Sequence, residues 1–261
     1  MADADAVRGA GVPDRLPSVQ SPAPPPPAES AAMTLVDHLT ELRSRIIKSI
    51  LSVVAGSVIG FLLAPSIQRI LISPLPASAL PLQVLGPGDA FGIALRIAVV
   101  VGVVLSMPVL LYQLWAFVAP GLTPSERRTL RPWIPLALFF FALGVTIAWI
   151  ILPFAIGFLL AFTNDVIVAH LAAPPYFDFV TTMFLAFGLL MEFPIVLYAL
   201  SRVGIATSAR LRASRRMVIL GIAIFSAIAT PGGDLVSPTV LGLTMYVLFE
   251  LTIIAIRRSG R

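Results

Sequence analysis

The chain has 261 residues, of which 58% are hydrophobic and only 12% are charged, and its mean hydropathy is +0.96. This composition excludes an ordinary soluble domain, which needs a polar shell, and makes lipid the main solvent. A formal net charge of +5 suggests nucleic-acid binding in a soluble protein, but here the arginines flank apolar stretches. The absence of cysteine excludes disulfides, thiolate metal sites and cysteine nucleophiles.

Residues 1–33 contain almost no bulky apolar side chains and include a proline-rich run at 21–27. We therefore expect a disordered, Pro-rich tail. The tail lacks the apolar core of a signal peptide, so the first membrane span is expected to act as its own insertion signal.

Six apolar stretches follow the tail and predict an all-α polytopic membrane protein with a six-helix transmembrane domain at 34–256. A bilayer core about 30 Å thick needs roughly 20 apolar residues per crossing. The fifth stretch has about 14 residues and reaches only about 21 Å, so the bilayer thins there or the helix ends within the hydrocarbon layer. The expected spans are about 46–64, 92–115, 133–154, 179–200, 217–230 and 238–256, and the last two are short.

Sixteen of the 18 Lys and Arg residues lie before or at the start of the first stretch, in alternate gaps between stretches, or after the last one. Only Arg69, after the first stretch, and Arg96, near the start of the second, lie toward the other side. Because cytoplasmic loops are enriched in Lys and Arg, this pattern predicts cytoplasmic N and C termini, with residues 257–261 as a short basic end. The outer segments 65–91 and 155–178 are long for simple connections, and we expect them to cap the outer ends of the helices.

The segment before the first span has leucines at helical spacing, which indicates an amphipathic helix on the inner surface. Glu41 and Arg45 form an i,i+4 pair there, worth only about 0.3–0.5 kcal/mol and compatible with helix solubility alone. A second glutamate, Glu126, follows Thr123 and Pro124, and helix capping at the start of the third span would explain it fully. The residues alone leave both glutamates open between structural and functional roles.

Two more glutamates lie inside the spans. Glu192 falls near the bilayer midplane, where an ionised carboxylate is costly, so it is expected to be protonated, hydrated or paired. Pro194 frees the carbonyl of Leu190 and predicts a kink. Glu250 lies closer to Arg257 and can snorkel or pair, so function and structure are equally open for it.

The sequence lacks the residues that several classes of enzyme chemistry require. Lys48 is the only lysine and no Gly-rich phosphate loop precedes it, while the two histidines, His38 and His170, lie outside the spans. We therefore expect no enzyme activity, no catalytic residue, no metal site and no cofactor. Asp234 ends a Pro-Gly-Gly-Asp turn, and turn formation alone explains it.

Taken together, these residues resemble the TatC family, the six-span core subunit of the twin-arginine protein translocase. The resemblance covers about residues 33–256. It rests on the runs 38–45 (HLTELRSR) and 108–122 (PVLLYQLWAFVAPGL), the Glu-Arg-Arg at 126–128, the Phe-Gly at 187–188 with Glu192 and Pro194, and residues 245–250. The chain departs from the family pattern at Thr123 and Pro124, and at the extra glycine before Asp234.

The resemblance implies a concave, glove-like bundle in the bacterial plasma membrane that recognises consecutive arginines in the signal peptides of folded cargo. It also implies single-span partners, TatA and TatB, in a hetero-oligomer of several copies, no nucleic-acid partner, and transport driven by the proton-motive force. Carried over by position, the signal-peptide-binding residues are Glu41, Glu126, Arg43 and Leu39, the intramembrane polar residues are Glu192 and Glu250, and the outer-cap residues are Phe91 and Asp234.

A proton-coupled secondary transporter of small solutes that uses Glu192 is the alternative. A midplane carboxyl group would support it equally well. Inverted repeats would favour this alternative, but the six spans differ in length and loop character.

Overall fold

The computed structural model describes residues 35–121, 123, 133–164, 170–202, 208–230 and 234–258. Helices dominate these parts of the chain, as expected, while the tail at 1–33 and the final residues lie outside them. The elements are α1 (Leu35–Ile72), η1 (Ala77–Ala79), α2 (Asp89–Val118), η2 (Ala119–Gly121), α4 (Trp133–Leu160), α5 (Ala173–Leu190), α6 (Phe193–Arg202), α7 (Ser208–Ala213), α8 (Arg215–Ala229) and α9 (Val236–Arg258).

Five helical segments within the described ranges are long and apolar enough to cross a membrane, with α5 and α6 together forming one of them. The remaining apolar helix, α8, corresponds to the expected fifth span. It has 15 residues, and this span was predicted to be short. At 1.5 Å per residue it extends about 22 Å, less than a hydrocarbon core of about 30 Å. The last helix, α9, has 23 residues and is longer than its expected span.

Two helices continue past prolines where the predicted spans ended or were about to end. α1 runs through Pro65 to Ile72, and α4 runs through Pro153 to Leu160. A proline inside a helix removes its own N–H donor, while its carbonyl remains available. The Nε atom of Arg69 donates to the carbonyl oxygen of Pro65 at 3.3 Å. The segment from 65 to 72, expected as part of an outer loop, is therefore helical.

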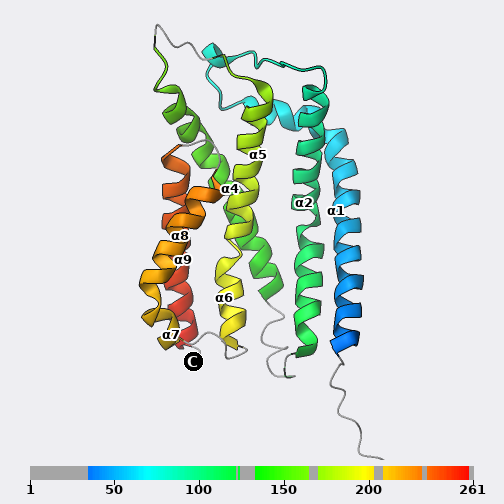
Figure 1. The fold of residues 1–261 in the computed structure, drawn as a ribbon, viewed down its shortest axis with the longest axis vertical. Coiled ribbons are helices and arrows are strands. Elements are labelled where there is room, and N and C mark those ends of the chain that lie inside the picture. Colours follow the sequence, from blue (N-terminus) through cyan, green and yellow to red (C-terminus); the bar gives the residue numbers. More distant parts are fainter. Residues whose placement is uncertain are drawn as a thin grey trace, which may run out of the picture.

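The helices form one bundle in which α1 and α2 run antiparallel along one side and α8 and α9 lie on the other (Figure 1). α5 and α6 lie between them, and α4 crosses at an incline. The start of α1 and the ends of α6 and α9 share one end of the bundle with α7, and we call it the basic end. The segments there carry Arg43, Arg45, Lys48, Arg210, Arg212, Arg215, Arg216, Arg257 and Arg258.

At the opposite end of the bundle, hydrogen bonds join the two segments that were expected to act as caps. The backbone N–H of Gln83 donates to the carbonyl of Leu171 at 2.9 Å, and the N–H of Ala173 donates to the carbonyl of Gln83 at 2.7 Å. The hydroxyl of Tyr176 donates to the carbonyl of Leu71 at 2.6 Å. These bonds tie the end of α1 to the start of α5.

The core of the bundle lies where α4, α5 and α9 meet. Its largest fully buried side chains include Met183, Phe187, Leu241, Phe249 and Ile256. α1 packs mainly against α2 instead, and most of its large apolar side chains are exposed. This distribution suits a helix whose outer face contacts lipid.

Candidate functional site

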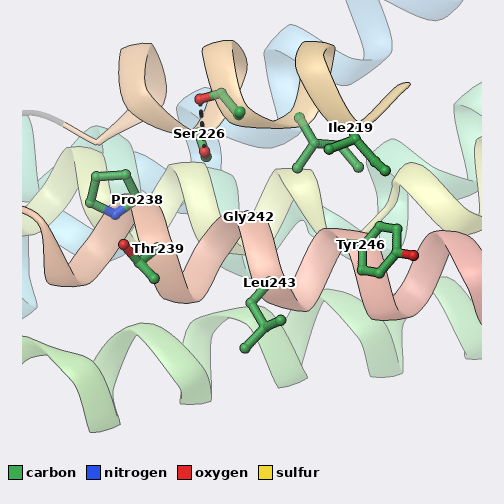
Figure 2. A pocket seen from close by; sticks show the side chains of 9 residues that line it. Ile219, Ser226, Pro238, Thr239, Gly242, Leu243 and Tyr246 are labelled. Atoms are coloured by element: carbon green, nitrogen blue, oxygen red, sulfur yellow. Dashed lines mark hydrogen bonds between the residues drawn. The ribbon is translucent and has the colours of Figure 1, made fainter. Parts of the chain in front are cut away.

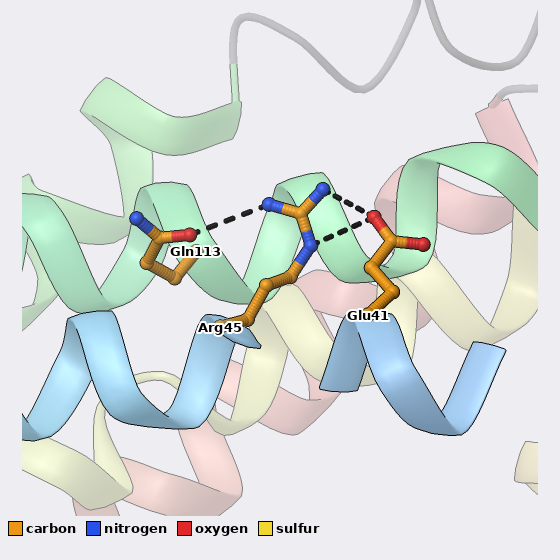
Figure 3. Close-up of polar contacts among 3 residues, drawn as sticks. All are labelled: Glu41, Arg45 and Gln113. Carbon is orange, nitrogen blue, oxygen red and sulfur yellow. Dashed lines mark hydrogen bonds and ion pairs between the residues drawn. The ribbon is translucent and has the colours of Figure 1, made fainter. Parts of the chain in front are cut away.

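A cluster of three polar side chains joins the beginning of α1 to the end of α2 (Figure 3). The Nε of Arg45 donates to Oε1 of Glu41 at 2.9 Å, and a terminal nitrogen of the same guanidinium also contacts this oxygen. The other terminal nitrogen donates to Oε1 of Gln113 on α2 at 3.3 Å. Arg45 thus bridges a carboxylate on its own helix to an amide on the neighbouring helix.

Only one of the two oxygens of the Glu41 carboxylate takes part in these contacts. The side chains of Glu41 and Arg45 are 17% and 22% exposed, so water screens the pair less than a fully exposed pair. The second carboxylate oxygen, Oε2, is buried and has no hydrogen-bond partner among the residues that the structure describes. A buried acceptor of this kind is a favourable place for a donor from a bound molecule.

A stacked ring pair fixes the same helix ends together. The rings of His38 and Phe117 have centroids 4.5 Å apart and planes 19° apart. His38 lies one turn before Glu41 on α1, and Phe117 lies one turn after Gln113 on α2. The position of Glu41 therefore depends on contacts between α1 and α2 on both sides of it.

The other residues predicted for this site lie partly outside the described structure. Leu39 and Arg43 are exposed on the first turns of α1, Leu39 with 63% of its surface accessible. Glu126 lies outside the described residues, so its distance from Glu41 stays a prediction. The structure brings Glu41 together with Arg45 and Gln113, and leaves Leu39 and Arg43 at the surface nearby.

Glu192 occupies the break between α5 and α6, where Pro194 predicted a kink. Both of its carboxylate oxygens are buried and lack a hydrogen-bond partner among the described residues. Its backbone carbonyl accepts the N–H groups of Ile195 at 3.0 Å and Val196 at 3.1 Å, which starts α6. The structure therefore contains a carboxyl group inside a spanning segment, beside an interrupted helix.

Glu250 is paired, but its partner differs from the neighbour that the sequence suggested. A terminal nitrogen of Arg215, at the start of α8, donates to Oε2 of Glu250 at 2.6 Å. Arg215 is far from Glu250 in sequence, whereas the expected neighbour, Arg257, is two turns away on the same helix. This pair joins α8 to α9 at the basic end.

The two residues predicted for the outer caps have different environments. Phe91 is 63% exposed, and its ring lies 6.4 Å from that of Phe61. Asp234 is buried, and its Oδ1 accepts the backbone N–H of Ser237 at 2.6 Å. Asp234 thus has a clear structural role as a cap for the start of α9.

A mostly apolar hollow of about 330 Å³ lies between α8 and α9 (Figure 2). Ile219 and Ser226 line it from α8, and Pro238, Gly242 and Tyr246 line it from α9. Among the residues described, no group of three or more His, Cys, Asp or Glu side chains could hold a metal ion.

Reasoning from sequence gave no role to Gln113 or to the stacking of His38 on Phe117. Gln113 could have been noticed as the one amide side chain within the apolar stretch at 108–122. The ring stacking joins residues that are 79 positions apart, and no local pattern indicates such a contact.

The chain has clear relatives of known family. The family model described as TatC, Sec-independent protein translocase protein, matches residues 37–243. The TatC protein of Carboxydothermus hydrogenoformans is 33% identical over 226 residues, which cover 86% of this chain and 93% of that protein. The TatC protein of Aquifex aeolicus is 34% identical over 226 residues, with 85% and 93% coverage.

A solved structure is similar as well. A crystal structure described as that of the twin arginine translocase receptor TatC has a TM-score of 0.75 and 34% sequence identity, covering 86% of this chain and 100% of that one. The resemblance predicted from the motifs is thereby confirmed. With a matching family model over most of its length and relatives more than 30% identical, this chain belongs to the TatC family of Sec-independent protein translocase proteins.

Proposed function

We propose that this chain is the receptor for twin-arginine signal peptides and the core scaffold of a translocase that exports folded proteins. Its membership of the TatC family and its spanning helices support a multi-pass membrane component of a translocase rather than an enzyme. The similar crystal structure is described as that of a twin arginine translocase receptor, which supports the receptor role.

The single observation that carries the site assignment is that Glu41 has one oxygen bonded to Arg45 and a second oxygen without a described partner. A guanidinium group is a planar fork that a carboxylate accepts through two hydrogen bonds, whereas a lysine ammonium is a point charge. The buried Oε2 of Glu41, without a described partner, offers an acceptor to such a group. Glu126 is proposed as the second carboxylate, with Arg43 and Leu39 completing the binding surface.

The orientation of the protein follows from its charges. Basic residues concentrate where α1 begins and α9 ends, and Lys and Arg are enriched on the cytoplasmic side of membrane proteins. We therefore assign the basic end to the cytoplasm, with both chain termini there, and the chain itself to the plasma membrane of a bacterium. In this orientation Glu41 faces the side from which newly made cargo arrives.

The remaining assignments concern the membrane-embedded and outer parts. Glu192 is proposed as the functional polar residue inside the membrane, within a concave face of the bundle, and Glu250 as a second such residue. Phe91 and Asp234 are assigned to the outer caps. The partners are the single-span subunits TatA and TatB in a hetero-oligomer, and the proton-motive force supplies about 2.3 kcal/mol per charge per 100 mV.

The alternative function, a proton-coupled transporter of small solutes, is not supported. The family model and the similar proteins are named as protein translocase components. A buried carboxyl group at Glu192 fits either function, so it does not favour the transporter.

Photo-crosslinking of a twin-arginine signal peptide to this protein in membranes tests the proposal. We expect Glu41→Gln and Glu126→Gln each to reduce capture of the Arg-Arg peptide, while membrane insertion of the protein stays normal. Unchanged capture in both variants would remove the recognition role of these carboxylates.

A further inference from the structure

The guanidinium of Arg45 contacts Glu41 asymmetrically. Both of its nitrogens that face the carboxylate approach the same oxygen, Oε1. In a side-by-side pair each nitrogen would take its own oxygen and occupy the whole carboxylate. Figure 3 shows instead that Oε2 of Glu41 points away from Arg45.

Gln113 engages the guanidinium nitrogen that does not face Glu41. Its side-chain oxygen accepts a hydrogen bond from the third guanidinium nitrogen at 3.3 Å, and it belongs to α2 rather than α1. The guanidinium is therefore held between two helices and is not free to follow Glu41. The carboxylate is fixed at Oε1, while Oε2 is buried and has no hydrogen-bond partner among the described residues.

We propose that Arg45 and Gln113 are positioning residues that hold Glu41 so that its Oε2 accepts an arginine of the signal peptide. This inference rests on the proposed function and adds a division of labour within the site. Gln113 anchors Arg45 to α2, Arg45 holds one oxygen of Glu41, and the peptide binds the other oxygen. Specificity for arginine then depends on Gln113, which never touches the peptide.

Arg45 could have the opposite role and compete with the peptide. It would then bind Glu41 until the peptide displaces it. A competitor predicts tighter peptide binding when its own contact is weakened. The geometry favours positioning, because Arg45 leaves Oε2 unoccupied and its remaining contact leads away from the carboxylate.

Equilibrium binding of fluorescent signal peptides to the full chain in lipid nanodiscs tests this inference. One peptide carries the Arg-Arg pair and the other carries Lys-Lys at the same positions. The variants are Gln113→Met, Arg45→Lys, the double variant and Glu41→Gln. Tyr112→Phe serves as the matched control, since it changes a half-exposed neighbour on the same turn of α2.

Positioning predicts that Gln113→Met and Arg45→Lys each weaken binding of the Arg-Arg peptide by about three- to tenfold. Binding of the Lys-Lys peptide stays unchanged, because a point charge does not need an oriented acceptor. The double variant is no weaker than Arg45→Lys alone, since Gln113 acts through Arg45. Tyr112→Phe binds both peptides as the unmodified protein does.

Four results would overturn the inference. Tighter binding in either single variant identifies Arg45 as a competitor. If binding of both peptides weakens equally, and the effects add in the double variant, Arg45 and Gln113 only support the structure in general. Weak binding in Glu41→Gln, with full binding in Gln113→Met and Arg45→Lys, overturns positioning but leaves the recognition role of Glu41 intact. Full binding in Glu41→Gln refutes that recognition role itself.

Discussion

The interface between α1 and α2 and the interface between α4 and α5 both depend on glycines, but the glycines face different neighbours. A Cβ atom added at Gly56 would lie 2.8 Å from the carbonyl oxygen of Gly102 and 3.0 Å from the hydroxyl of Ser106. That hydroxyl donates to the carbonyl of Ser52 at 2.7 Å. Small residues on α1 thus pack against small residues on α2, and one hydrogen bond crosses between them.

Between α4 and α5, glycines pack against both backbone and large side chains. A Cβ atom added at Gly144 would overlap the backbone carbonyl of Phe187 and lie 2.7 Å from the side chain of Met191. One added at Gly188 would lie 2.7 Å from the ring of Phe141. Both interfaces bring backbones close together. Large side chains fill the space between α4 and α5, as in the core of a soluble protein, whereas small residues and a polar bond hold α1 to α2.

The difference matters for the candidate site, because α1 packs mainly against α2. Glu41 and Gln113 lie on opposite sides of the α1–α2 interface, so a change of helix spacing there reaches the site directly. A similar change between α4 and α5 affects the core without moving Glu41. Variants at the two interfaces therefore separate a loss of stability from a loss of peptide capture.

Gly102→Leu is expected to have the largest effect. A Cβ atom at this position would lie 2.7 Å from the backbone nitrogen of Ser57 and 2.8 Å from the carbonyl of Val53, so the helices must separate. We expect a loss of about 3 kcal/mol in the free energy of unfolding, together with a loss of Arg-Arg peptide capture. Thermal unfolding and crosslinking measure the two losses.

Gly92→Leu is the matched control, since an added Cβ on the same helix meets nothing within 4 Å. Equal stability of the two variants would show that α1 and α2 do not depend on the close approach at Gly102.

Gly144→Ala is expected to cost about 2 kcal/mol of unfolding free energy, because the overlap with the Phe187 carbonyl involves backbone that moves little. Capture of the Arg-Arg peptide should be unchanged, since α4 does not contribute to the Glu41 cluster. Gly157→Ala on the same helix meets nothing within 4 Å and should have no effect on either measurement. A loss of capture in Gly144→Ala at normal stability contradicts the separation of the two regions.

Glu192→Leu is expected to raise the free energy of unfolding by about 1 kcal/mol, because a buried carboxyl group without a described partner is costly. Export of a folded reporter with a twin-arginine signal should fall, if Glu192 serves transport. Glu250→Leu is the contrasting variant, since it removes the pair with Arg215 and should destabilise the protein. Lower stability in Glu192→Leu would indicate that Glu192 has a structural partner.

Ser106→Ala is expected to have the smallest effect, a loss of about 0.6 kcal/mol in unfolding free energy, because hydrogen bonds between helices in membranes contribute modestly. Thr146→Ala is its control, since the Thr146 hydroxyl donates within its own helix α4, to the carbonyl of Ala142 at 2.8 Å. Chemical denaturation in detergent compares the two. A larger loss in Thr146→Ala would contradict the importance of the polar bond between α1 and α2.

Local patterns predicted the helical class, the short fifth span and the break near Glu192, because hydropathy and proline act within a few residues. The same patterns placed the end of the first span at Pro65, where one missing N–H group does not end the helix. They also suggested Arg257 as the neighbour of Glu250. The observed partner is Arg215, whose approach depends on how α8 packs against α9.

The i,i+4 pair of Glu41 and Arg45 was visible in the sequence, and the structure contains it. What local patterns could not indicate is the third member, Gln113, which lies 68 residues from Arg45. Contacts at that separation depend on the docking of α1 against α2, which the glycines permit without specifying which side chains meet.

Disulfide capture of a signal peptide tests the central claim most directly, because the chain has no cysteine of its own. Leu39→Cys and Phe91→Cys place one thiol at the start of α1 and one at the start of α2, at opposite ends of the bundle, on residues that are both 63% exposed. With a peptide carrying a cysteine beside its arginine pair, we predict a disulfide at position 39, none at position 91, and loss of the first when Lys-Lys replaces Arg-Arg. Equal capture at both positions, or equal capture of the Lys-Lys peptide, would contradict recognition of paired arginines at the basic end.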